Sequence, residues 1–94
     1  MIVAGRPMLE KFKTKHADVR QQLDAWLAEV EDANWQSPKD IKARYASASF
    51  LDNNRVVFNL KGARYRLLVK VAYNTRIVMA LNIGTHAEYN SWKP

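Results

Sequence analysis

The period of the hydrophobic residues changes near residue 54, and this change limits the fold more than any other feature. Apolar residues recur at helical spacing before it and alternate with polar residues after it. The alternation predicts three strands, at 55–60, 64–73 and 76–83, separated by short turns at Gly62 and at residues 74–75. Turns this short force neighbouring strands to be antiparallel, so the C-terminal part predicts an antiparallel sheet.

The residues before the change predict a strand followed by helices. The apolar segment 1–4 is expected to be a strand, which Gly5 and Pro7 end. Helical patterns then run over residues 8–15 and 16–35, and we interpret them as a hairpin with one apolar face. The aromatic residues of this face are expected in the core, since such a stripe is more often core than a cofactor site.

A third, shorter helix is predicted to begin at Pro38, with Ser37 as its cap and Asp40 in its first turn. Residues 52–54, Asp-Asn-Asn, predict a turn. With 94 residues, the chain is expected to form a single domain over residues 1–94. Its predicted class is α+β, with an N-terminal strand and a helical hairpin packed on an antiparallel sheet and a short C-terminal helix.

Composition excludes several kinds of protein. The chain has no cysteine, so neither disulfide bonds nor a thiolate zinc site can stabilise it. Neither a signal peptide nor a membrane-spanning segment is recognisable, so we expect a cytoplasmic protein that has no membrane partner. No cofactor or metal is expected either, because paired histidines at metal spacing and a glycine-rich phosphate loop are absent.

The positive charge is confined to the strand-forming part. Residues 1–54 carry eight Lys or Arg and eight Asp or Glu, whereas residues 55–94 carry seven Lys or Arg against Glu88 alone. The entire net charge of +6 therefore lies after residue 54. This asymmetry favours an anionic partner, with nucleic acid first, although a solvated basic surface that aids solubility would look the same.

The predicted middle strand has two different faces. One face is apolar or aromatic and suits packing on the helices. The other carries Arg64, Arg66 and Lys70 within seven residues, together with Leu68 and Ala72. Like charges on one strand face repel, so we expect a partner there. The alternative is a one-sided sheet that exposes ordinary polar residues to water.

His86 lies in the segment Thr-His-Ala-Glu, which has the form of a helix capping box. The capping box alone accounts for the presence of Thr85 and Glu88, without any catalytic or binding role. His86 would be the first helical residue and Tyr89 would lie three residues further on. A neutral imidazole there can transfer protons at cellular pH, or His86 can be only a polar residue at a helix start. The basic residues and one histidine suit metal-free attack of the RNA 2′-hydroxyl on its own phosphate.

The segments "NNRVVFNLKG", "YRLLV" and "IGTHAEY" together resemble the HigB branch of the RelE-like toxins of type II toxin–antitoxin systems. The resemblance covers nearly the whole chain. It implies a ribosome-dependent endoribonuclease that cleaves mRNA and inhibits translation. It also implies a cognate antitoxin with a helix-turn-helix domain, through which alone the complex would bind operator DNA.

The resemblance also implies site residues. The basic strand positions of the family fall on Arg64 and Arg66, with Lys61 in the preceding turn, and its histidine and tyrosine fall on His86 and Tyr89. Asn59 matches too, and we interpret it as closing the hairpin. The predicted catalytic residues are Arg66, His86 and Tyr89, and the predicted phosphate-binding residues are Lys61, Arg64, Lys70 and Arg55.

One departure from the family concerns the last strand. Many relatives have an aromatic and a basic residue in this strand, near the positions where this chain has Met79 and Leu81. The loss of a cation there leaves room for reduced activity or a different cleavage preference. Two other kinds of protein remain open on the same fold. One is a non-catalytic protein that binds RNA or the ribosome, and the other is a structural partner of a regulatory protein.

Overall fold

The fold combines a sheet with helices on both of its sides. A computed structural model describes residues 1–92. Its helical elements are α1 (Arg6–Lys15), the 3₁₀ turn η1 (Ala17–Val19), α2 (Arg20–Asp32), α3 (Pro38–Arg44) and α4 (His86–Ser91). Its strands are β1 (Ile2–Ala4), β2 (Ser49–Leu51), β3 (Arg55–Leu60), β4 (Tyr65–Ala72) and β5 (Ile77–Thr85). No helix within residues 1–92 is both long and apolar enough to cross a membrane.

The strands of the described chain form one five-stranded sheet in the order β1-β5-β4-β3-β2. The pairs β2–β3, β3–β4 and β4–β5 are antiparallel, as the short turns require, and β1 joins the far edge parallel to β5. The predicted α+β class is confirmed, with the helical hairpin on the sheet and a short C-terminal helix. The predicted strand at 55–60 has the bounds of β3.

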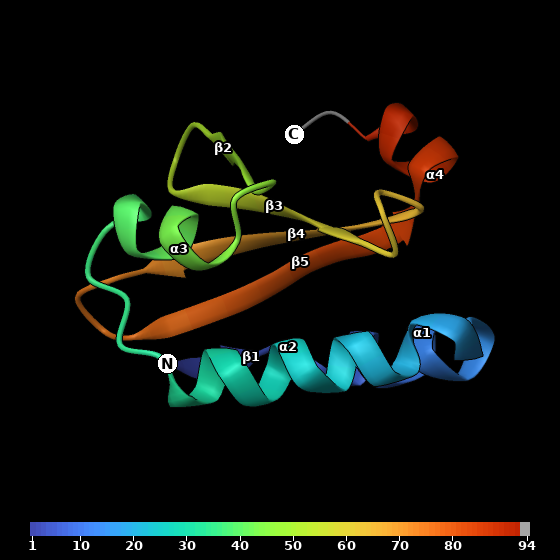
Figure 1. The fold of residues 1–94 in the computed structure, drawn as a ribbon, viewed down its shortest axis with the longest axis horizontal. Helices are drawn as coiled ribbons and strands as arrows, with labels where there is room; N and C mark the ends of the chain where they lie inside the picture. Colours follow the sequence, from blue (N-terminus) through green and yellow to red (C-terminus); the bar gives the residue numbers. More distant parts are fainter. Residues whose placement is uncertain (93–94) are drawn as a thin grey trace.

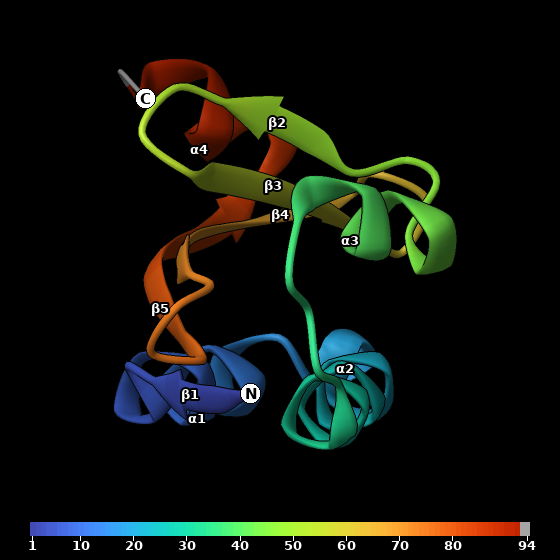
Figure 2. The same ribbon diagram turned by 90° about the vertical axis from the view of Figure 1, so that its left-hand side faces the viewer.

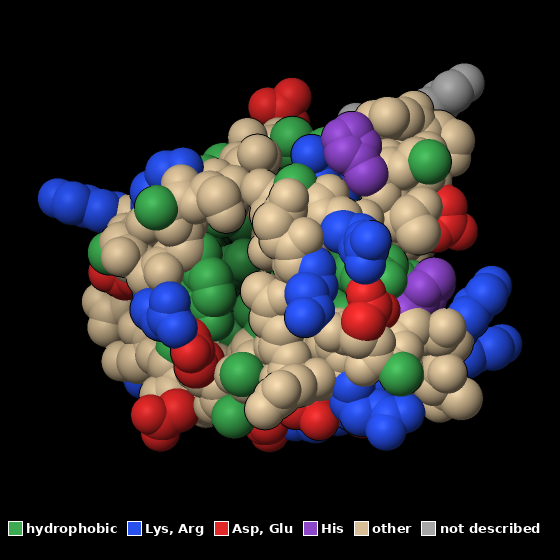
Figure 3. Space-filling view, turned by 45° about the vertical axis from the view of Figure 1, so that its right-hand side comes forward, with side chains coloured by type: hydrophobic (Ala, Val, Ile, Leu, Met, Phe, Trp, Pro, Cys, Tyr) green, Lys and Arg blue, Asp and Glu red, His purple; other side chains and the backbone are tan. Residues whose placement is uncertain are grey.

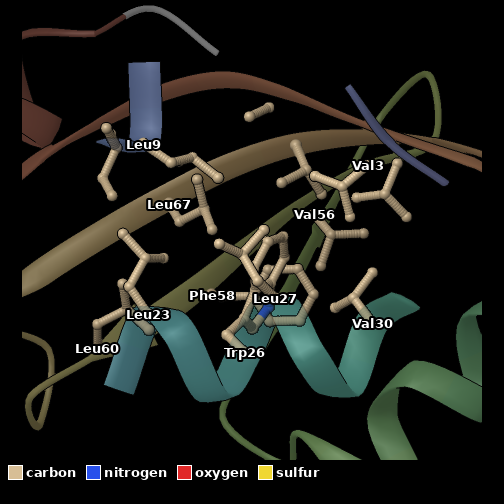
Figure 4. Close-up of a cluster of buried hydrophobic side chains, with 14 of the residues drawn as sticks. Val3, Leu9, Leu23, Trp26, Leu27, Val30, Val56, Phe58, Leu60 and Leu67 are labelled. Carbon is tan, nitrogen blue, oxygen red and sulfur yellow. The ribbon is translucent and has the colours of Figure 1, made fainter. Parts of the chain in front are cut away.

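The helices lie on opposite sides of the sheet. In Figures 1 and 2, α1 and α2 lie beneath the sheet and α4 lies on its other side. The core fills the space between the sheet and the first two helices. Figure 4 shows apolar side chains of α2 facing those of β3 and β4. Phe58, Leu67 and Val69 are among the side chains that are fully buried there.

Alternation along β4 follows the sequence prediction. Tyr65, Leu67, Val69 and Val71 are buried in the core that faces the helices. We call this side of the sheet the inner face and the opposite side, where α4 lies, the outer face.

The structure differs from the sequence prediction at two places before β3. β2 was not predicted, because a three-residue strand is too short to show an alternating pattern. α3 begins at Pro38 with Ser37 in the N-cap position and Asp40 in the first turn, as predicted, but the Ser37 side chain makes no capping hydrogen bond. Instead, the backbone N–H of Gln36 donates to Asp40 Oδ2 at 2.9 Å, so Asp40 holds the start of this helix.

A β-bulge interrupts the alternation in β5. Leu68 pairs with Asn82 and Val69 pairs with Ala80, so Leu81 is an extra residue without a cross-strand partner in β4. As a result, Ala80 and Ile83 are both buried although they are three residues apart. The bulge places Gly84 on the outer face, where a strictly alternating strand would have turned it inward.

Gly5 makes the turn from β1 into α1 with a φ of +87°, in the left-handed region. A Cβ atom there would also lie 2.8 Å from the backbone oxygen of Ala80 in β5. Gly62, in the turn between β3 and β4, has a φ of +60°, but a Cβ atom there would meet nothing within 4 Å beyond its chain neighbours in residues 1–92. An alanine at Gly62 would therefore suffer backbone strain alone, whereas an alanine at Gly5 would suffer strain and a steric contact.

We expect Gly5→Ala to lower the free energy of unfolding by about 2–4 kcal/mol, since left-handed strain and overpacking act together. Gly62→Ala should cost only about 1–2 kcal/mol, from the strain alone. Urea unfolding of both variants measures this difference. Equal losses would show that the approach of Gly5 to β5 adds nothing to the strain.

Candidate functional site

Cross-strand pairing places the predicted site residues on the outer face. Arg66 of β4 lies between Asn59 of β3 and Gly84 of β5. Lys70, four residues further along β4, lies between Arg55 and Met79. Residues that are directly opposite in antiparallel strands point to the same side of the sheet. The outer face therefore has one row centred on Arg66 and a second row centred on Lys70, roughly 13 Å away at 3.3 Å per residue.

Arg66 and Tyr89 are in direct contact. The guanidinium carbon of Arg66 lies 4.7 Å from the centre of the Tyr89 ring, which is a cation–π geometry. Both side chains are partly buried. The ring of Tyr89 packs in turn against Trp92, with 5.3 Å between the ring centres. The structure thus brings together two of the three predicted catalytic residues, and α4 supplies the second of them.

The absence of a side chain at Gly84 lets α4 approach the sheet. A Cβ atom on Gly84 would lie 3.0 Å from Trp92 Cζ2 and 3.1 Å from both Cβ and Oε1 of Glu88. These distances are shorter than ordinary van der Waals contact. Gly84 is also the cross-strand neighbour of Arg66. The position of Tyr89 over Arg66 therefore depends on a glycine in the adjacent strand.

The predicted capping box at the start of α4 is confirmed. The backbone N–H of Glu88 donates to Thr85 Oγ1 at 3.1 Å, and the N–H of Thr85 donates to Glu88 Oε1 at 2.8 Å. This bond from the Thr85 backbone keeps the pKa of Glu88 below its ordinary value. His86 follows as the first residue of α4, with an exposed side chain. Its backbone N–H donates to the carbonyl of Arg64 at 2.9 Å, which ties α4 to the start of β4.

The prediction that Arg64 shares a strand face with Arg66 was wrong. β4 begins at Tyr65, and Arg64 lies in the turn before it, where Ala63 has a φ of +77°. Its Nη1 lies 3.2 Å from Asp18 Oδ2, so the guanidinium is directed to the helical layer. Asp18 also accepts a hydrogen bond of 2.7 Å from the Tyr65 hydroxyl. The Tyr65 hydroxyl first, and Arg64 second, keep the pKa of Asp18 below its ordinary value.

The other predicted phosphate-binding residues are spread over the surface. Lys61 is exposed at the tip of the β3–β4 turn, and its backbone N–H donates to Gln22 Oε1 of α2 at 2.7 Å. Lys70 is exposed in the second row of the outer face. Its neighbour Arg55 donates from Nε to the carbonyl of Asp52 at 3.0 Å, within the β2–β3 turn. Lys70 and Arg55 therefore lie together, and Lys61 lies apart from them.

On the face that Figure 3 shows, the positive charge does not form a continuous basic patch. Figure 3 shows Lys and Arg side chains in separate groups, with Asp or Glu beside some of them. Arg64 with Asp18 is one such pair. The charge asymmetry along the sequence is therefore offset at one point in space, where Asp18 of the helical half reaches Arg64 of the strand half.

The candidate site is an open surface. A cleft of about 460 Å³ lies between α2, the segment after α3 and the end of β3, and Trp26, Phe58 and Asn59 are among its walls. None of the seven predicted site residues lines it. An open surface suits a long polymer better than a small molecule, which proteins usually enclose in a cleft. Among residues 1–92, no three His, Cys, Asp or Glu side chains gather in a group that could hold a metal ion.

Comparison with known proteins identifies the family of the chain and agrees with its fold. The model of the HigB toxin family, described as the RelE-like toxic component of a toxin–antitoxin system, matches residues 19–92. The chain belongs to this family of RelE-like toxins, which implies a cognate antitoxin as its partner. Among proteins with curated descriptions, none matches the chain.

Sequence reasoning missed the importance of two residues. Asn59 was interpreted as closing the β3–β4 hairpin, but it lies directly opposite Arg66. Gly84 received no role, although it determines how closely α4 approaches β5. A glycine immediately before a capping box, at the end of a strand, was the available signal for a helix that folds back onto that strand.

The contact of Asp18 with Tyr65 and Arg64 predicts a pH dependence of stability. The pKa of Asp18 is lower in the folded protein than the reference value of about 3.9, so its contribution is fully present above that pH. It is lost as the pH falls through the folded-state pKa. We expect wild type to exceed Asp18→Asn in free energy of unfolding at pH 7, with the difference shrinking below about pH 4. Urea unfolding at a series of pH values measures it, and a difference independent of pH would contradict the assignment.

Gly84→Ala should push α4 away from the outer face by a few tenths of an ångström. We expect a loss of about 1–3 kcal/mol in unfolding free energy, as for other overpacking substitutions, and a changed NMR shift of the Tyr89 ring protons. Gly62→Ala is the control for the ring shifts only, because its surroundings are open while its left-handed backbone lowers stability by itself. Unchanged Tyr89 ring shifts in Gly84→Ala would mean that the glycine does not position this contact.

Proposed function

We propose that the protein is a ribosome-dependent endoribonuclease that cleaves mRNA without a metal ion and thereby inhibits translation. The observation that carries the proposal is the contact of Arg66 with Tyr89 on the outer face, at 4.7 Å. It joins a permanent positive charge to an aromatic ring that can stack on a base. His86 opens the same helix as Tyr89, with its imidazole exposed to an incoming strand.

In the proposed reaction, the 2′-oxygen of a ribose attacks the adjacent phosphorus. The bond between phosphorus and the 5′-oxygen of the next nucleotide breaks, and a 2′,3′-cyclic phosphate remains. A base removes the 2′-hydroxyl proton, and an acid protonates the leaving 5′-oxygen. His86 is the candidate for one of these proton transfers, and the ribosome can supply part of the rest. Arg66 stabilises the negative charge that develops on the phosphate oxygens.

The remaining residues have supporting roles in this proposal. Tyr89 orients the phosphate or stacks on a base. Lys70 and Arg55, in the second row of the outer face, bind phosphates further along the strand. Lys61 contacts the backbone from the β3–β4 turn. Arg64 contributes charge at longer range, because its guanidinium pairs with Asp18.

The partners follow from the family and from this face. The substrate is mRNA on the ribosome, and the regulator is a helix-turn-helix antitoxin through which the complex reaches operator DNA. Met79, the cross-strand partner of Lys70, is 46% exposed, so the outer face is partly apolar as well as cationic. Leu81, at the bulge in the same strand, is 37% exposed. An acidic, amphipathic antitoxin segment would complement such a face.

Arg66→Ala should lower the rate of mRNA cleavage on ribosomes by about 10²–10³, the usual loss for one electrostatic donor. His86→Ala should lower it comparably or less, because the ribosome supplies part of the acid–base chemistry. Cleavage is measured from the fragments of a defined mRNA on purified ribosomes. It should persist in chelator and leave a 2′,3′-cyclic phosphate or the 3′-phosphate formed from it.

Arg20→Ala is the matched control, since Arg20 is an exposed arginine at the start of α2, on the other side of the sheet. It should cleave at the rate of wild type. If Arg66→Ala and His86→Ala also cleave at that rate, the site is wrong and His86 is only a helix-start residue. Retention of ribosomes or RNA without any cleavage would favour the non-catalytic binding protein.

A further inference from the structure

Asn59 and Arg66 each have a buried polar atom that lacks a hydrogen-bond partner within residues 1–92. The atoms are Oδ1 of Asn59 and Nε of Arg66, and both are inaccessible to solvent. One is an acceptor and the other is a donor. A buried polar group without a partner costs about 1–3 kcal/mol, so each atom is expected to have a partner in the working protein.

These complementary atoms belong to directly paired residues. Asn59 of β3 and Arg66 of β4 are cross-strand partners, and their side chains point to the same side of the sheet. Cβ atoms in such a pair are roughly 4.5–5.5 Å apart, which an asparagine and an arginine side chain easily span. The other cross-strand neighbour of Arg66 is Gly84, which has no side chain to offer.

A second contact determines which end of the Asn59 amide is the oxygen. Its Nδ2 donates to the carbonyl of Ser47 at 3.0 Å. A carbonyl can only accept, so the nitrogen must face Ser47 and the oxygen remains for another donor. The contact with Ser47 therefore supports Oδ1 as the acceptor available to Arg66.

The two atoms are not hydrogen-bonded to each other in the structure. We propose that Asn59 is a positioning residue that accepts a hydrogen bond from Arg66 Nε in the working protein and fixes the plane of the guanidinium against Tyr89. The proposal rests on the proposed function of Arg66. With Nε held by Asn59 and one side of the group covered by the Tyr89 ring, the four Nη hydrogens remain for a phosphate. A neutral amide suits this task, because a carboxylate would offset the positive charge that the phosphate needs.

The test compares Asn59→Ala and Asn59→Asp by NMR of the ¹⁵N-labelled protein, through the exchange of arginine Nε hydrogens with water. Asn59→Ala removes the acceptor, so Arg66 Nε–H should exchange about tenfold to a hundredfold faster, as for loss of a hydrogen bond to a charged group. Asn59→Asp keeps an oxygen at this position but loses the donor to Ser47. Its charged oxygen should make Arg66 Nε–H exchange slower than in wild type.

Arg55 provides a control in the same spectra, since its Nε donates to Asp52 in the β2–β3 turn. Its exchange should not change in either variant. The proposal is overturned if Arg66 Nε–H exchanges at the wild-type rate in Asn59→Ala, or if it exchanges faster in Asn59→Asp. The second result would mean that the role of Asn59 is limited to its hydrogen bond with the Ser47 carbonyl. If Asn59→Ala folds poorly, Asn59→Asp still decides, because slower exchange of Arg66 Nε–H than in wild type is expected there.

A cleavage measurement separates this inference from the proposed function. Asn59→Ala should slow mRNA cleavage about tenfold in wild type but add no further loss to Arg66→Ala, because Asn59 acts through Arg66. An equal further loss in both backgrounds overturns the positioning role. If wild type does not cleave RNA at all, the proposed function fails, while the exchange of Arg66 Nε–H still decides whether Asn59 holds the guanidinium.

Discussion

Burial of one face of β4 is the constraint on which the rest of the structure depends. Leu67, Val69 and Val71 are at most 1% exposed, and each such side chain contributes about 1.5–3 kcal/mol by leaving water. A shift of the strand by one residue would exchange them for Arg66 and Lys70, and would bury two charges. The hydrophobic core therefore determines which side of the sheet carries the cations, and so it determines where the site lies.

Local patterns in the sequence were enough to predict the parts of the fold that local forces determine. The bounds of β3, the alternation of β4 and the capping box of Thr85 and Glu88 all depend on residues within a few positions of one another. The features that were missed depend on distant segments. The pairing of Arg64 with Asp18 joins residues 46 positions apart, and the bulge at Leu81 is defined only by the partner strand β4.

The candidate site shows the same division. Residue types and spacing indicated a basic strand face and singled out His86, and the resemblance to the HigB toxins implied Arg66, His86 and Tyr89 as the catalytic residues. The proximity of Arg66 and Tyr89 depended on α4 folding over the outer face, which the sequence could not show. The structure meets that condition through Gly84, whose missing side chain admits the helix. A strand glycine and a cross-strand asparagine thus belong to the surroundings of the site, although neither carries a charge.

The parallel pairing of β1 with β5 determines how late the sheet can be completed during synthesis of the chain. Ile2 pairs with Ile77, which follows it by 75 positions, so β1 leaves the ribosome long before its partner strand exists. Such distant pairs form late in folding, because a long loop must close first. Tyr89 is made later still, on the last helix. A chain that is released before residue 89 has been added therefore has Arg66 without its aromatic neighbour, and the contact between the two side chains can form only after α4 has been made.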